Sequence, residues 1–104
     1  MYKEYEKFGL TEREIDELKR ILLPKEKIEK IILFGSRARG NYTRISDIDI
    51  ALKGSCLNST DINLLRDEFE ESRIIYKVDL IHYEKITNND FKNNIDKDGI
   101  EILK

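Results

Sequence analysis

The feature of this sequence that most constrains its fold is a nearly continuous apolar run that ends at Phe34. The run reads KIEKIILF over residues 27–34, and Gly35 and Ser36 follow it directly. A strand with one face in water alternates apolar and polar residues, whereas a short run that is apolar throughout is typical of a strand covered on both faces. The sequence therefore predicts a central strand that ends at Phe34 and has covering elements on both sides.

Periodic patterns on both sides of this run predict the remaining elements. Apolar residues three and four positions apart indicate helices, and alternation of apolar with polar residues indicates strands. The order of these elements favours an α/β or α+β fold, in which helices pack against one small sheet. The expected helices cover residues 11–23, 59–73 and 87–99, and the expected strands cover residues 47–52, 74–83 and 100–103.

Short polar residues mark where these helices begin. Thr11 is the expected N-cap of the first helix, and Glu14 three residues later completes a capping box. Ser59 or Thr60 is expected to cap the second helix, and Thr87 the last one. Each cap accepts a hydrogen bond from an amide group that has no partner within the helix, so these residues set the expected starting points.

Length, charge and cysteine content limit the class of protein. The 104 residues suit one domain over residues 1–104, and the formal net charge of −2 argues against a broad basic face that binds nucleic acid directly. The single Cys56 allows no internal disulfide and no zinc site of cysteine and histidine. The first ten residues lack the apolar core of a signal peptide, and no apolar run reaches the roughly 18 residues of a membrane helix. We therefore expect a cytoplasmic protein without membrane contact.

The turn after the central strand has the residues of a phosphate site. Gly35 lets the main chain approach a ligand closely, and Ser36 adds a hydroxyl group at the start of an expected short helix, SRAR. Arg37 and Arg39 add cations that can fork onto phosphate oxygens. A Gly–Ser pair alone is a weak signal, because most such pairs are ordinary turns. The stretch therefore permits nucleotide binding without requiring it.

Two aspartates, Asp47 and Asp49, lie on the strand expected over residues 47–52. Residues i and i+2 of a strand point the same way, with Cα atoms roughly 6.5–7 Å apart. Carboxylates at this spacing can converge on magnesium, which takes oxygen ligands and usually keeps waters and substrate phosphates in its shell. The alternative is a solvent-facing strand edge with two charges. For the pair alone, that alternative is the stronger one.

A third acid, Asp79, lies in the apolar strand expected over residues 74–83. Burying an unpartnered acid in such a strand is costly, so a partner or an open face is required. The alternative is a charge on the polar face of an alternating strand, because Lys77 and Asp79 share parity. If this strand lies beside that of Asp47 and Asp49, the three acids facing the Gly–Ser turn describe a two-metal phosphoryl-transfer site.

These residues together resemble a known family. Gly35 and Ser36, ten further residues, and then Asp47-Ile48-Asp49 are similar to the G-S-x10-D-x-D signature of the DNA polymerase β-like nucleotidyltransferases. The string GSRARG…SDIDIAL resembles their minimal (MNT) group, small proteins that are commonly the antitoxin partners of HEPN-domain toxins. The resemblance spans most of the chain, from the first helix to the final DGIEIL.

The resemblance implies a mixed sheet flanked by helices, the nucleotidyltransferase fold, and a set of site residues. Asp47, Asp49 and Asp79 would hold two magnesium ions, with Asp79 as the general base for the acceptor hydroxyl. Gly35 and Ser36 would hold the triphosphate of ATP, helped by an arginine of the turn, Arg37 or Arg39. The reaction would transfer AMP from ATP and release pyrophosphate.

The acceptor of this transfer is expected to be another protein. Only 25 residues follow Asp79, too few for an acceptor domain, so we expect the acceptor on a partner's surface. By resemblance, that partner is a HEPN ribonuclease toxin that is modified on a tyrosine and forms a complex with this chain. Two alternatives remain: an antitoxin that blocks its toxin by binding alone, and a nucleotidyltransferase that acts on a small molecule or an RNA 3′ end.

Overall fold

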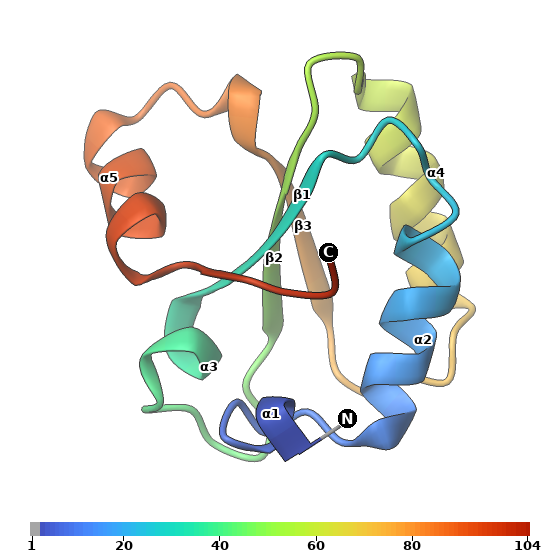
Figure 1. Ribbon diagram of the computed structural model, residues 1–104, viewed down its shortest axis with the longest axis vertical. Coiled ribbons are helices and arrows are strands. Elements are labelled where there is room, and N and C mark those ends of the chain that lie inside the picture. Colours follow the sequence, from blue (N-terminus) through green and yellow to red (C-terminus); the bar gives the residue numbers. More distant parts are fainter. Residues whose placement is uncertain (1–2) are drawn as a thin grey trace.

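The computed structural model describes residues 3–104, so the first two residues of the domain expected over residues 1–104 lie outside the described part. Two helices come first, and from the second one on helices and strands alternate along the chain (Figure 1). The helices are α1 (Lys3–Glu6), α2 (Glu12–Leu22), α3 (Gly35–Arg39), α4 (Ser59–Glu70) and α5 (Asn89–Asp98), with a 3₁₀ turn at Tyr83–Lys85. The strands are β1 (Lys30–Phe34), β2 (Ile48–Lys53), β3 (Val78–His82) and β4 (Ile100–Glu101).

The four strands form one mixed sheet in the order β3-β2-β1-β4. Strand β1 runs antiparallel to both of its neighbours, whereas β2 and β3 are parallel and are joined through α4. A parallel pair needs such a crossover, because its second strand must start at the same end as the first. The mixed sheet with flanking helices confirms the expected fold class.

Helices cover both faces of the sheet, as the apolar run over residues 27–34 predicts. On one face, Ile31 and Leu33 of β1 pack in a core with apolar residues of α2 and α4. On the other face, Ile32 and Phe34 pack with Ile95 of α5. Figure 1 shows α2 and α4 on the right of the sheet and α3 and α5 on its left. The prediction of a central strand buried on both faces is confirmed.

Two helix caps differ from the expected residues. Helix α4 is capped by Asn58, whose side-chain oxygen accepts a hydrogen bond from the Asp61 amide at 2.9 Å, and Asp61 returns the bond. Helix α5 is capped by Asn88 rather than Thr87, through a bond from the Phe91 amide. In both places an asparagine next to the predicted cap reaches the third amide of the helix better. The capping box of Thr11 and Glu14 at α2 is confirmed.

The strand boundaries also shift. Strand β3 begins at Val78, so residues 74–77 form a loop and not the first half of a strand. Strand β2 begins at Ile48, which places Asp47 immediately before it, and β4 covers only Ile100–Glu101. Ladder pairing decides these limits: the parallel pairing of β2 with β3 begins at Ile48 and Val78. An apolar pattern alone does not show where a neighbouring strand starts.

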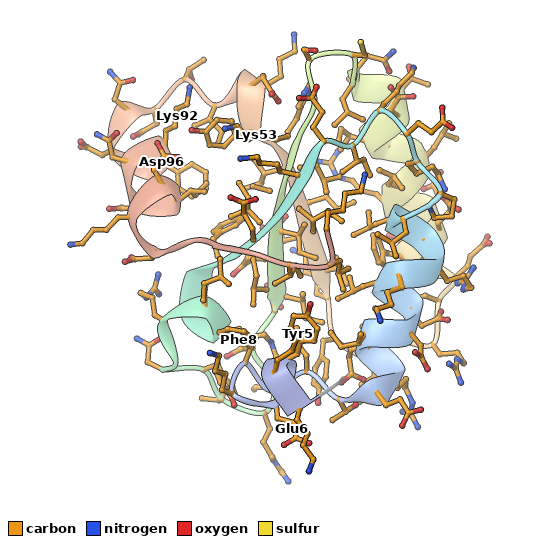
Figure 2. All side chains as sticks on the ribbon, viewed as in Figure 1. Tyr5, Glu6, Phe8, Lys53, Lys92 and Asp96 are labelled. Atoms are coloured by element: carbon orange, nitrogen blue, oxygen red, sulfur yellow. The ribbon has the colours of Figure 1, made fainter. Side chains whose placement is uncertain are left out.

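The N-terminal segment adds a short helix that the sequence patterns do not predict. Tyr5 of α1 accepts a hydrogen bond from the Leu103 amide, and Phe8 and Leu10 after it are buried. Figure 2 shows Tyr5 and Phe8 at the lower end of the molecule, near the turn between α1 and α2. The N-terminal segment therefore forms part of the core. None of the helices in residues 3–104 has the length and apolar character needed to cross a membrane.

Candidate active site

The pairing of β2 with β3 brings two of the three predicted acids together. Asp49 and Asp79 are direct partners in the parallel register of these strands, and both are partly exposed. Residues that pair across two strands project from the same face, so the two carboxylates share one face of the sheet. The condition set for a shared site, that the strand of Asp79 lie beside the strand of Asp49, is therefore met.

Asp47 lies at the same end of the sheet. It is exposed and directly precedes Ile48, whose amide donates a 2.8 Å hydrogen bond to the Lys77 carbonyl. This bond joins the entry into β2 to the entry into β3. All three aspartates therefore sit where two neighbouring parallel strands begin, although they are separated by up to 32 positions in the sequence.

The charges of the three acids act on one another. Partial burial raises the pKa of Asp49, and the nearby carboxylates of Asp79 and Asp47 raise it further. The positive charges of Arg39 and Arg37 act in the opposite direction but do not cancel the rise. The three acids therefore form a region of negative charge that the two arginines offset only in part. Such a region attracts cations.

Gly35 brings the turn after β1 against the acids. In the antiparallel register Phe34 pairs with Asp49, so the next residue, Gly35, lies directly beside that carboxylate. A Cβ atom at Gly35 would come within 2.2 Å of Asp49 Oδ2, and the φ angle of +75° also favours glycine. The sequence suggested that a glycine here would allow close approach, and the structure shows that the approaching group is Asp49.

The short helix α3 starts at Gly35 and carries the other residues of the predicted turn. Ser36, in its first turn, is partly exposed, and its carbonyl accepts bonds from the Gly40 and Asn41 amides that close the helix. Arg39 is exposed at the last position of α3, and its charge reaches Asp49. Helix α3, which carries Gly35, Ser36 and Arg39, therefore starts beside Asp49 at this end of the sheet.

Arg37 differs from Arg39 in its surroundings. Its side chain is almost completely buried, with a relative exposure of 1% for the residue. Its guanidinium group donates hydrogen bonds to main-chain carbonyls of two segments, residues 8–9 and residues 46–47. The donors of Arg37 are therefore used by main-chain carbonyls, whereas the sequence predicted that Arg37 or Arg39 would fork onto phosphate oxygens. Spacing alone did not separate the two arginines.

The donor set fits magnesium better than zinc. The three predicted ligands offer only carboxylate oxygens, which hard cations such as magnesium prefer, and no histidine or cysteine is among them. Across residues 3–104, no three Asp, Glu, His or Cys side chains already stand in the tight arrangement of a metal centre. Convergence of Asp47, Asp49 and Asp79 on one or two ions therefore stays a prediction.

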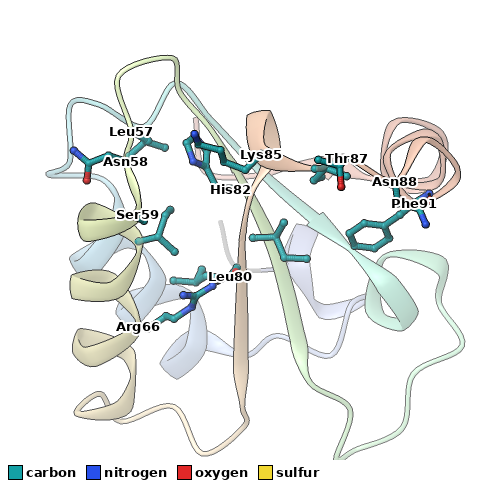
Figure 3. A pocket seen from close by; sticks show the side chains of 13 residues that line it. Leu57, Asn58, Ser59, Arg66, Leu80, His82, Lys85, Thr87, Asn88 and Phe91 are labelled. Carbon is teal, nitrogen blue, oxygen red and sulfur yellow. Dashed lines mark hydrogen bonds between the residues drawn. The ribbon is translucent and has the colours of Figure 1, made fainter.

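Two cavities flank the free edge of β3. The larger, of about 660 Å³, lies between α4 and α5 at the far end of β3, and none of the predicted site residues lines it (Figure 3). The second, of about 570 Å³, lies between α4 and the loop before β3 and includes Asp79 and Tyr76 in its wall. By volume alone, the first cavity would be the better candidate for the active site. The three aspartates and the effect of their charges on one another instead favour the end of the sheet that the second cavity reaches.

Comparison with known proteins identifies relatives of this chain. Residues 16–104 match the family described as polymerase beta, nucleotidyltransferase. A protein of Methanocaldococcus jannaschii named "Putative protein adenylyltransferase" is 38% identical over 86 residues, which cover 81% of this chain and 86% of the relative.

Solved structures give the same fold. One chain from a crystal structure of the toxin–antitoxin pair MntA–HpeT is 27% identical, with a TM-score of 0.65 over 90% of this chain and 72% of that one. Another, from a toxin–antitoxin crystal structure with AMP-PNP, has a TM-score of 0.70 at 23% identity over 85% of this chain and 71% of the other, a similarity of fold alone.

Proposed function

Because this chain belongs to the polymerase β nucleotidyltransferase family, we propose that it is an antitoxin that transfers AMP from ATP to a tyrosine of a HEPN ribonuclease toxin. The chain is a nucleotidyltransferase, an enzyme that moves a nucleoside monophosphate from a triphosphate to an acceptor. The proposal adds the nucleotide, the acceptor and the residues that carry the reaction.

One observation carries the proposal: Asp49 and Asp79 are paired across parallel strands, with Asp47 at the entry to the same strand as Asp49. Transfer of a nucleotidyl group requires that negative charge on the triphosphate be compensated where the bond to the leaving group breaks. The acids supply no such compensation themselves, but they can hold the cations that do. Magnesium bound by Asp47, Asp49 and Asp79 would neutralise the triphosphate and position it.

The residues of this chain have distinct proposed parts in the reaction. The tyrosine oxygen of the acceptor attacks the α-phosphorus of ATP, the bond from that phosphorus to the bridging oxygen breaks, and pyrophosphate leaves. Asp79 takes the proton of the tyrosine hydroxyl. Gly35, whose main chain lies beside Asp49, also lets the triphosphate come close to the turn. Ser36 donates a hydrogen bond from its hydroxyl group to a phosphate oxygen, and the exposed Arg39 adds a positive charge beside it.

The relatives support the choice of a protein acceptor. The M. jannaschii relative is named as a putative protein adenylyltransferase, and the two solved structures described above come from toxin–antitoxin complexes. The net charge of −2 supplies no broad basic surface that would favour an RNA end as acceptor. An AMP group on a tyrosine at an RNA-binding surface would add negative charge and weaken binding of the RNA backbone.

Transfer of AMP can be measured directly. The protein is incubated with magnesium, ATP and the product of the adjacent reading frame, and the intact mass of that product is recorded. We expect the mass of one or more AMP units, and label from the α-phosphate of ATP but none from the γ-phosphate. Asp47→Asn and Asp49→Asn should each abolish the adduct, since either change removes a magnesium ligand.

The control is Asp67→Asn, which removes an exposed carboxylate on α4 and should leave transfer unchanged. The absence of any adduct with the intact protein would contradict the proposal. If Asp47→Asn and Asp49→Asn still neutralise the toxin in cells, blocking by binding alone is the function. If label appears on a small molecule or on RNA instead, the protein acceptor is wrong.

A further inference from the structure

We propose that Arg37 is a positioning residue for the carboxylate site: it fixes the main chain at the entry to β2, packs against Tyr76 in the loop before β3 and does not bind phosphate. This inference rests on the proposed function, since it concerns the same three aspartates. It assigns to Arg37 a part that differs from that of Arg39, although both belong to the five-residue helix α3.

The hydrogen bonds of Arg37 join two segments. Nη2 donates to the Ser46 carbonyl at 2.8 Å, and Nε lies 3.2 Å from the same oxygen and 3.3 Å from the Asp47 carbonyl. Nη1 donates to the carbonyls of Phe8 and Gly9, each at 3.1 Å. The guanidinium therefore holds the main chain of Asp47 directly and ties it to the buried N-terminal segment.

Two aromatic rings reach Arg37 from the loops that carry the acids. Its guanidinium carbon lies 4.7 Å from the ring centroid of Tyr76, in the loop before Asp79, and 5.4 Å from that of Tyr42, in the loop before Asp47. Rings at these distances attract a cation and restrict its position. Arg37 thus contacts both of the loops that lead into the strands of the site.

The contacts require an arginine. A planar guanidinium presents five N–H groups in a fixed fork, so one side chain can serve carbonyls on opposite sides, whereas an ammonium group offers three donors around a single point. Arg37 forms none of the ion pairs found in residues 3–104, and it is buried. Its charge is instead balanced by carbonyl dipoles and lies within reach of Asp49.

The N-terminal turn is shaped around this side chain. Gly9 has a φ angle of +73°, and a Cβ atom there would lie 2.6 Å from Arg37 Nη1 and 2.6 Å from Cε2 of Tyr42. The absence of a side chain at Gly9 therefore makes room for the guanidinium and the ring. The turn, Arg37 and the loop before Asp47 form one packed unit behind the carboxylates.

The test measures binding of Mn²⁺, a paramagnetic substitute for magnesium, to the nucleotide-free protein by electron paramagnetic resonance. Arg37→Lys keeps the charge but loses the fork, and we expect Mn²⁺ affinity to fall by about 10–100-fold, the usual effect of removing a group that orients metal ligands. At saturating Mn²⁺, affinity for AMP-PNP should stay unchanged. Arg39→Lys should show the reverse pattern, with weaker AMP-PNP binding and unchanged Mn²⁺ affinity.

Arg20→Lys is the matched control, because Arg20 lies on α2 and pairs with Glu17, away from the three aspartates. Circular dichroism checks that each variant folds. If Arg37→Lys does not fold, Tyr76→Leu decides, since it removes the ring over the guanidinium and should also weaken Mn²⁺ binding. Unchanged Mn²⁺ affinity in the deciding variant, or a loss of AMP-PNP affinity alone, overturns the inference. If the wild-type protein itself binds no Mn²⁺, the proposed function fails instead.

Discussion

At the scale of single residues, the site depends on a close contact between Gly35 and Asp49. The main chain at Gly35 has a left-handed φ angle and faces the Asp49 carboxylate without room for a side chain. Gly40, at the other end of α3, also has a left-handed φ angle of +84°, but its Cβ position is open. A substitution at Gly40 therefore introduces backbone strain alone, whereas the same substitution at Gly35 also disturbs Asp49.

Gly35→Ala is expected to lose both stability and metal binding. An alanine in the left-handed conformation costs about 1–2 kcal/mol. Its methyl group would also displace the carboxylate of Asp49. Gly40→Ala should lose a similar free energy of unfolding in urea but bind Mn²⁺ as the wild type does. Equal Mn²⁺ affinity in both variants would show that the contact of Gly35 with Asp49 does not matter to the site.

The carboxylate of Asp49 is expected to reduce the stability of the metal-free protein near neutral pH. Burial first, and then the charges of Asp79 and Asp47, raise its pKa above the ordinary value. The native state therefore binds the proton more tightly than the unfolded chain, so stability falls as the pH rises from the ordinary carboxyl range through the raised pKa. Asp49→Asn removes this loss.

Unfolding in urea without metal ions measures this effect. At pH 7 we expect Asp49→Asn to be more stable than the wild type, and the difference to shrink at about pH 4, near the ordinary pKa of aspartate. Added magnesium should stabilise the wild type but not Asp49→Asn, because it binds the native carboxylates. The exposed Asp67, changed to asparagine, is the control. A variant less stable than the wild type at pH 7 would refute this account of the charges.

Sequence patterns identify the residue types of the site but not the direction of each side chain. The places of Gly35, Asp49 and Asp79 follow from the apolar runs beside them, and the condition that the strands of Asp49 and Asp79 be neighbours is met in the structure. Arg37 and Arg39 could not be told apart, because helix α3 is a single turn without a pattern of apolar spacing. Which of the two is buried depends on carbonyls of residues 8–9 and 46–47, distant segments whose contact no local rule predicts.

At the scale of elements, the β2–α4–β3 unit determines the site. The helix returns the chain to the end of the sheet where β2 begins, so β3 runs parallel and Asp79 meets Asp49. Alternation and helical spacing predict these three elements from the sequence. They do not predict which strands pair, and the start of β3 was expected four residues early because residues 74–77 continue the apolar pattern without a partner strand.

Glu17 of α2 is bonded to the chain just after α4, and we expect it to stabilise the packing of these two helices. It accepts bonds from the Arg20 side chain at 3.0 and 2.9 Å and from the Arg73 amide at 3.0 Å. Bonds from the Arg20 side chain first, and then from the Arg73 amide, lower the pKa of this buried carboxyl group to about 2. The stabilisation is therefore complete above the ordinary carboxyl pKa and is lost as the pH falls toward 2.

Glu17→Gln tests this connection between elements. Charged hydrogen bonds typically contribute about 1.5–3 kcal/mol, so we expect a loss of that size in the free energy of unfolding at pH 7. The difference from the wild type should shrink as the pH is lowered from about 4.5 toward 2. Glu26→Gln, at an exposed position after α2, should change little at any pH. A loss that does not depend on pH would mean that packing, and not charge, is responsible.

At the scale of the whole molecule, different pairs of helices cover the two faces of the sheet. Helices α2 and α4 cover one face along its length, whereas α3 and α5 cover the other (Figure 1). The acids lie at the end of the sheet where β2 and β3 begin, and the N-terminal segment is tied to that end through Arg37. The larger cavity lies at the opposite end of β3. The three aspartates and the larger cavity therefore lie at opposite ends of β3, and the predicted metal ligands do not line that cavity.

A crystal structure with AMP-PNP and Mn²⁺ tests the central claim most directly. Manganese has the oxygen preference of magnesium and gives an anomalous signal that locates it. We predict anomalous peaks within bonding distance of the Asp47, Asp49 and Asp79 carboxylates, with the triphosphate between these ions and the turn at Gly35 and Ser36. AMP-PNP in the larger cavity between α4 and α5, with no peak at the three aspartates, would contradict the account.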